Sequence, residues 1–99
     1  MKRIEEAENR LDKLNETVLN LNNCLDEFHN LLDDYKELNE YYGSKEWFKD
    51  KENYEKGKIK DIKAGVLSED AVWNLDEDIR DTVDKMKDII EKYSTNRVD

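Results

Sequence analysis

The chain has 99 residues, which is enough for one domain of modest size and leaves no room for a second. Charged residues make up 43% of it and hydrophobic residues 36%, with three glycines and no proline, a balance that favours long exposed helices. The net charge of −9 argues against a nucleic-acid partner, because binding DNA or RNA depends on Lys and Arg side chains that neutralise phosphates.

The sequence also argues against a membrane protein. Its longest apolar run is only a few residues, far short of the ~20 that a spanning helix needs. The N-terminal stretch MKRIEEAENRLDK turns acidic at once and lacks the apolar core of a signal peptide. The single cysteine, Cys24, cannot form an internal disulfide, which agrees with a reducing compartment. We therefore expect a cytoplasmic protein with no membrane partner.

A heptad pattern of apolar residues, typical of a coiled coil, runs through the first part of the chain. The seam consists of Ile4, Ala7, Leu11, Leu14, Val18, Leu21, Leu25, Phe28, Leu32 and Tyr35. No Gly or Pro interrupts it, so the pattern predicts one helix over about residues 3–42, roughly 60 Å long. Further apolar residues widen the stripe in the second half, where more than one neighbour could cover it. These are Leu19, Cys24, Leu31, Leu38 and Tyr41.

The stretch EYYGSKEWFKD, residues 40–50, places four aromatic rings around a Gly-Ser pair. Gly43 follows the last periodic residue, where a left-handed helix end costs glycine little. Ser44 can then cap a new helix. We expect this short helix over about residues 45–55, followed by a lysine-rich connector over about residues 56–67.

A third helix is predicted from Ser68 onward. Ser68 as N-cap, with Glu69 and Asp70 at the first helical positions, places an acceptor and negative charge at a helix N-terminus. The helix is expected over about residues 69–93, roughly 36 Å, so it can cover only about half of the first helix. Its apolar stripe is Val72, Leu75, Ile79, Val83, Met86, Ile89, Ile90 and Tyr93.

These elements predict an all-α fold in a single helical domain, residues 1–99. The long N-terminal helix packs antiparallel on the C-terminal helix, with the short helix and the connector between them. The residues expected in the core are Leu25, Phe28, Leu32, Leu75, Ile79 and Val83.

Two strings resemble a known family. YYGSKEW at 41–47 and AGVLSEDAVW at 64–73 together cover about 17 residues, and the layout of the whole chain agrees. They resemble the bacterial family catalogued as domain of unknown function 4298. The resemblance implies a bacterial, helical, cytoplasmic protein and supplies no activity, substrate or catalytic residue. Members often carry a proline just before the segment matching 62–65, and its absence here predicts a more helical connector.

Candidate chemistry is sparse. Asp26 and His29 form a D-x-x-H pair, which is half of a di-iron site in helical bundles. They flank the apolar seam rather than lie in it, so we favour a solvated histidine and expect no metal. Cys24 and His29 would point about 140° apart on one helix, so they do not form a nucleophile and base. No phosphate loop, C-x-x-C or HExxH motif is present. We expect no catalytic residues and no cofactor.

The aromatic residues of the middle segment form the candidate binding surface. They are Tyr41, Tyr42, Trp47, Phe48, Tyr54 and Trp73. One interpretation is a hydrophobic plug where the connector folds over a helix end. The other is a recognition surface, because Trp and Tyr are enriched in binding hot spots.

The start of the seam predicts self-association. Ile4, Ala7, Leu11, Leu14 and Val18 extend past the reach of the third helix, and a second copy can cover them if two first helices pair antiparallel. We therefore expect a homodimer and a non-enzymatic interaction or structural module, with another protein as a further candidate partner. A small-ligand site at the aromatic residues and a carboxylate-based metal protein remain the alternatives.

Overall fold

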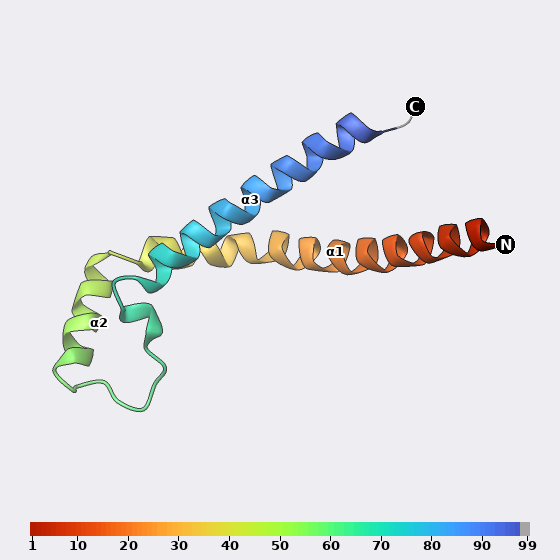
Figure 1. Ribbon diagram of the computed structural model, residues 1–99. Coiled ribbons are helices and arrows are strands. Elements are labelled where there is room, and N and C mark those ends of the chain that lie inside the picture. Colours follow the sequence, from red (N-terminus) through yellow and green to blue (C-terminus); the bar gives the residue numbers. More distant parts are fainter. Residues whose placement is uncertain (98–99) are drawn as a thin grey trace. The chain divides into compact units, whose positions relative to one another are not determined.

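The computed structural model describes residues 1–97, and its regular elements are helices (Figure 1). In chain order they are α1 (Lys2–Tyr41), α2 (Lys45–Glu55), the 3-10 helix η1 (Gly65–Leu67) and α3 (Ala71–Asn96). No strand occurs in this range, which confirms the all-α prediction. Within the same residues, no helix combines the length and the apolar character needed to cross a bilayer.

The chain forms two compact units, Met1–Glu37 and a second that starts at Leu38. The first unit is a single stretch of helix, so nothing within it can cover its apolar seam. In agreement, none of the 40 residues of α1 is buried. The antiparallel packing of the first helix on the last, and the description of the chain as one domain, stay predictions.

The turn between α1 and α2 forms as its residues predict. Gly43 has a φ of +79°, the left-handed conformation that glycine adopts without strain, and it ends α1. Ser44 has an extended backbone, and its hydroxyl accepts a hydrogen bond from the backbone N–H of Trp47 at 3.2 Å. The predicted helix stop and restart at the Gly-Ser pair are therefore confirmed.

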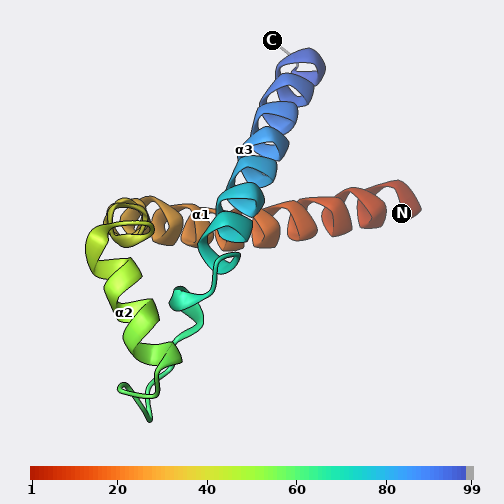
Figure 2. The same ribbon diagram turned by 90° about the vertical axis from the view of Figure 1, so that its left-hand side faces the viewer.

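The connector is not helical between α2 and η1, so the expectation of a more helical linker was wrong. Gly57, with a φ of +75°, ends α2: its N–H and that of Lys58 donate back to the carbonyls of Tyr54 and Asn53. Asp61 also has a positive φ, 61°. The absence of proline does not make a helix here, because these left-handed residues turn the chain back. As a result η1 lies beside α2 (Figures 1 and 2).

The third helix starts at Ala71, two residues later than predicted, and ends at Asn96, three residues beyond the predicted end. The hydroxyl of Ser68 does accept a hydrogen bond from the N–H of Ala71, at 3.2 Å. The N-cap residue is nevertheless Asp70, whose side chain makes no capping hydrogen bond, so the prediction of Ser68 as N-cap with Glu69 and Asp70 inside the helix was wrong.

The buried core is small and lies in the second unit. It consists of Trp47, Leu67 and Val72, which are 3%, 7% and 3% exposed. The six residues predicted to form the core are half-buried or exposed, so that prediction was wrong. Burial occurs where η1 contacts both α2 and α3, and none of the predicted residues belongs to α2 or η1.

Candidate binding site at the aromatic corner

Trp47 is the centre of the corner between α1, α2 and η1. The hydrogen bond that the Ser44 hydroxyl accepts from the backbone N–H of Trp47 fixes the first turn of α2 and, with it, the position from which the Trp47 side chain starts. The indole Nε1 donates to the carbonyl of Val66 at 2.9 Å, which links α2 to η1 across nineteen residues of sequence. This bond satisfies the one polar atom of a nearly buried ring, as burial of an indole requires.

Two further rings and one cation surround the indole. Tyr42 meets it edge-on, with ring centroids 5.1 Å apart, and Phe48 does so at 4.9 Å. The Nζ of Lys51 lies 5.4 Å from the centroid of the Trp47 ring, within the range of a cation–π contact. The structure therefore brings Tyr42, Trp47 and Phe48 of the predicted surface together, and Trp47 is a structural plug.

Tyr41 makes a separate contact at the end of α1. Its hydroxyl donates to the carboxylate of Asp50 on α2 at 2.6 Å. This hydrogen bond is the main reason that the pKa of Tyr41 rises to about 12, with smaller contributions from desolvation and from the negative charge of Asp50. This hydrogen bond links the end of α1 to α2, and both side chains are half-buried.

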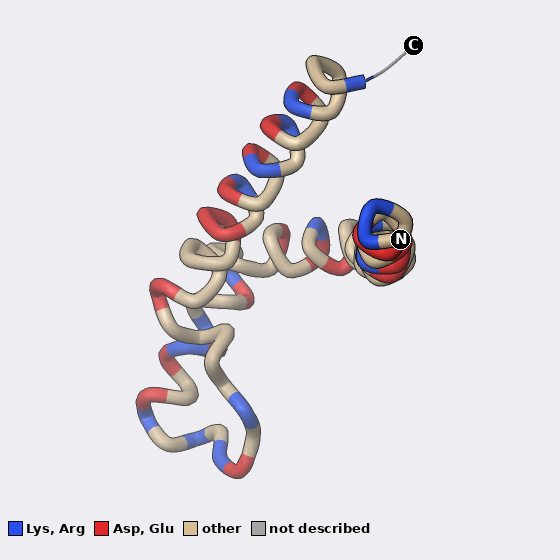
Figure 3. Tube along the Cα trace, turned by 45° about the vertical axis from the view of Figure 1, so that its right-hand side comes forward, with Lys and Arg blue, Asp and Glu red and all other residues tan. Residues whose placement is uncertain are grey.

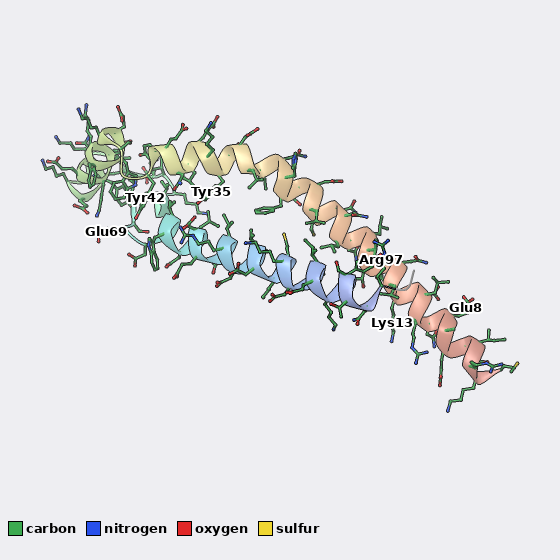
Figure 4. All side chains as sticks on the ribbon, turned by 90° about the horizontal axis from the view of Figure 1, so that it is seen from above. Glu8, Lys13, Tyr35, Tyr42, Glu69 and Arg97 are labelled. Atoms are coloured by element: carbon green, nitrogen blue, oxygen red, sulfur yellow. The ribbon has the colours of Figure 1, made fainter. Side chains whose placement is uncertain are left out.

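Glu69, just before α3, joins the corner through its backbone and its side chain. The hydroxyl of Tyr42 donates to its carbonyl, and the two residues lie together in Figure 4. Its carboxylate accepts a hydrogen bond from the Nζ of Lys51 at 2.8 Å. That bond lowers the pKa of Glu69 and raises the pKa of Lys51. The same lysine lies 3.9 Å from Glu55, so it bridges two carboxylates.

Three members of the predicted binding surface are exposed. Phe48 is 61% exposed although its edge touches Trp47, and Trp73 on the first turn of α3 is 58% exposed. Tyr54 is also exposed, near the end of α2. The corner thus combines a buried plug with exposed aromatic side chains, so both interpretations of the aromatic residues keep support.

Two pockets flank the segment from Ala64 to Leu67. One, of about 420 Å³, lies on the side of Lys51 and Tyr54 and has acidic walls. The other, of about 260 Å³, is lined by the Tyr41–Asp50 pair together with aliphatic side chains of the connector and η1. Most residues that line this second pocket are aliphatic, and Tyr41, Asp50 and Lys63 add polar groups to its lining.

Sequence reasoning missed the partners of the aromatic rings. Val66, Asp50 and Glu69 each accept a hydrogen bond from the corner, yet none was a candidate site residue. The carbonyl of Val66 and that of Glu69 act through the backbone, so their side-chain identity carries no signal. Lysines recur along α2 and the connector among acidic residues (Figure 3), and that pattern did not single out Lys51.

The predicted self-association residues are exposed along α1. Ile4, Leu11, Leu14 and Val18 are 55%, 52%, 63% and 52% exposed, and Ala7 is exposed as well. Nothing in the first unit covers them.

The candidate metal ligands, Asp26 and His29, are both exposed on α1. Among residues 1–97 no group of three or more His, Cys, Asp or Glu side chains is placed to hold a metal ion. Cys24 is a free cysteine and is exposed too. The expectation of a protein without catalytic residues or metal stays a prediction.

The geometry defines an all-α protein whose corner is built from the YYGSKEW and GVLSEDA segments, since Trp47 of the first segment bonds Val66 of the second. The chain belongs to the family described as Domain of unknown function (DUF4298), whose sequence model matches residues 4–94. The resemblance drawn from the two strings is confirmed. No curated protein and no solved structure matches the chain.

Proposed function

We propose that this protein is a small non-enzymatic module that works by helix–helix association, and that its partner is a second copy of itself. The observation that carries the proposal is the length of α1. Its 40 residues span about 60 Å, whereas the 26 residues of α3 span about 39 Å. Roughly a third of the α1 seam therefore lies beyond the reach of any other helix of the chain.

The exposed part of the seam is apolar enough to need a partner. Leu14 is 63% exposed and Ile4 is 55% exposed, and they belong to a continuous stripe rather than to scattered positions. Single exposed apolar residues are normal on a protein surface, but a continuous patch marks an interaction site. A second copy supplies a helix with the same heptad spacing.

Light scattering of the purified protein tests this proposal. We expect about twice the chain mass of 11.9 kDa at micromolar concentration. Leu14→Asp, which places a charge in the seam, should return the mass to that of the monomer. Asn23→Asp is the matched control, because it adds the same charge to α1 away from the seam and should leave the dimer intact. A wild-type monomer would refute the proposal.

A second candidate function is binding of a small molecule at the pocket of about 260 Å³. It is favoured by the combination of aliphatic walls with the Tyr41–Asp50 pair and Lys63, which can orient an apolar molecule that carries one polar group. Thermal-shift screening tests it, because a ligand of the native state raises the melting temperature. The shift should disappear in Ile59→Asp, a change in the wall of this pocket only.

We also propose a cytoplasmic location without a nucleic-acid partner. The single cysteine fits a reducing compartment and the net charge of −9 disfavours binding to phosphates. Salt-sensitive retardation of DNA by the purified protein would contradict the second part.

A further inference from the structure

The proposed self-association can be given an orientation and a register, which rest on that proposal. We propose that two copies of α1 pair antiparallel with Val18 of each copy facing Leu21 of the other at the centre. Because α1 is unbroken from Lys2 to Tyr41, the spacing of the seam assigns one helix face over its whole length. The seam from Ile4 to Tyr35 lies about 46 Å along this face.

Side-chain size is the first argument for this register. The two smallest seam residues, Ala7 and Val18, lie in its N-terminal half, and its two aromatic rings, Phe28 and Tyr35, lie in its C-terminal half. In a parallel pair each residue faces its own copy, which leaves a gap at Ala7 and crowds two rings at Phe28. The antiparallel register pairs Ala7 and Phe28 each with a leucine, so its layers differ less in volume than those of a parallel pair, which suits a close-packed core. Its layers are Ala7 with Leu32, Leu11 with Phe28, Leu14 with Leu25, and Val18 with Leu21.

Charge along the helix is the second argument. Residues 25–41 carry six acidic side chains and one lysine, whereas residues 2–16 carry five acidic side chains and four basic ones. A parallel pair places the strongly acidic halves of the two helices side by side. The antiparallel pair places each acidic half beside the nearly neutral half of the other copy, and it also opposes the two helix dipoles.

One pair of charges beside the seam sharpens the register. Glu8, which is labelled in Figure 4, and Lys36 both follow seam residues directly, so they lie on the same flank of α1. In the proposed register Glu8 faces Lys36 of the second copy, and symmetry makes this contact twice. A parallel pair would instead place Glu8 near Arg3, which is also attractive. The contact of Glu8 with Lys36 therefore identifies the register of an antiparallel pair, but it does not by itself decide between the parallel and the antiparallel orientation.

The wider stripe of the C-terminal half leaves room for a further neighbour. Cys24 and Leu31 lie on the other flank of the seam, and Leu31 is 47% exposed. A second copy that follows the seam itself does not need this flank. The pairing is therefore compatible with another helix packing on the same half of α1.

Disulfide trapping tests the orientation. Two variants of the full chain are made in a Cys24→Ser background, Leu14→Cys and an isotopically labelled Leu25→Cys, and they are mixed in a thiol–disulfide buffer. The proposed register brings the two introduced thiols together only in the mixed dimer, because a disulfide requires Cα atoms within about 7 Å. We expect mass spectrometry to show the mixed disulfide as the main product. Asn23→Cys, away from the seam, is the control, and it should form a disulfide with neither of the two variants.

The outcomes separate this inference from the proposed function. A main product made of two copies of the same variant would overturn the orientation while the dimer stands. A dimer by light scattering that traps no disulfide would overturn the register. A monomer would overturn both.

A charge exchange is an independent check. Lys36→Glu should weaken the dimer roughly tenfold, because it removes the two exposed ion pairs with Glu8, and adding Glu8→Lys should restore the dimer, because the pairs form again with their charges reversed. Failure of that rescue would also overturn the register.

Discussion

The first unit and the corner of the second unit contain similar kinds of apolar residue and bury them very differently. Along α1 no side chain is buried, although ten seam positions are apolar. At the corner, Trp47, Leu67 and Val72 are all less than 10% exposed, within a short length of chain. The difference lies in whether the chain returns on itself: η1 comes back beside α2, whereas the N-terminal half of α1 meets no returning segment of its own unit.

The comparison shows that heptad periodicity alone does not make a core. A single helix exposes its whole face to water, and its stability in proteins comes mostly from packing of that face against something else. The corner, by contrast, has directional contacts such as the bond from Trp47 to Val66 and the bond from Tyr42 to Glu69. We expect the corner to be stable within one chain and the start of α1 to depend on a partner.

Removing the plug should break the corner and has the largest expected effect. Trp47→Ala should lower the free energy of unfolding by about 3–5 kcal/mol, because it empties a buried aromatic site and leaves the carbonyl of Val66 without its donor. Urea unfolding followed by circular dichroism measures the change. Phe48→Ala is the control: its ring is 61% exposed, so the loss should be about 1 kcal/mol or less. Equal losses would show that the corner has no buried centre.

The turn can be tested without changing any side-chain contact. Gly43→Ala should destabilise the corner by roughly 1–2 kcal/mol, because its φ of +79° is unfavourable for a residue with a Cβ. Apart from Gly43 and its two chain neighbours, no heavy atom lies within 4 Å of the place where that Cβ would sit, so the effect is one of backbone conformation. Gly65→Ala, also with open space but without a positive φ, should change stability by less than about 0.5 kcal/mol. Similar results for both glycines in thermal unfolding would contradict this account.

The Tyr41–Asp50 pair predicts a loss of corner stability at high pH. The pKa of Tyr41 is raised from 10.0 to about 12 in the folded protein. Its contribution to stability is therefore complete below pH 10 and is lost as the pH rises through about 12, since the unfolded chain releases the proton first. Tyrosinate absorbance, with Tyr41→Phe subtracted, measures the value. In Asp50→Asn the pKa of Tyr41 should fall toward 10.0, and an unchanged pKa would rule out Asp50 as the cause of the raised value.

The smallest expected effect comes from the exposed pair of Lys51 and Glu69. Because the pKa of Glu69 is lowered, its contribution is present above the ordinary Glu value of 4.5 and is lost as the pH falls through the depressed folded value. In Lys51→Gln, the carboxyl titration of Glu69 by NMR should move up toward 4.5. Glu52, whose pKa is lowered by Lys56, should not move and serves as the control. A fixed Glu69 titration would show that Lys51 does not form the pair in solution.

The helices could be predicted from the sequence because their signals are local. Heptad spacing without Gly or Pro indicated α1, and the Gly43–Ser44 pair indicated its end and the start of α2. Ser68 indicated the approach to α3, although regular helix begins only at Ala71. The aromatic residues of the corner were recognised as a group for the same reason, since they are close together in the sequence.

The packing could not be predicted because it depends on contacts between distant segments. The path of the connector follows from left-handed Gly57 and Asp61, and a positive φ at an aspartate is not evident from sequence. The choice of Val66 as acceptor for Trp47 depends on that path. Periodicity identified Leu75 and Ile79 as core, but periodicity shows only which face is apolar and not what covers it.

Hydrogen exchange at several protein concentrations tests the central claim most directly, because it reports on both regions in one sample. If a second copy covers the seam, amide protection of residues 2–20 should increase with concentration across the dissociation constant, while protection of the corner around Trp47 and Val72 stays constant. Protection of residues 2–20 that is the same at every concentration would contradict the claim that the start of α1 depends on a second copy.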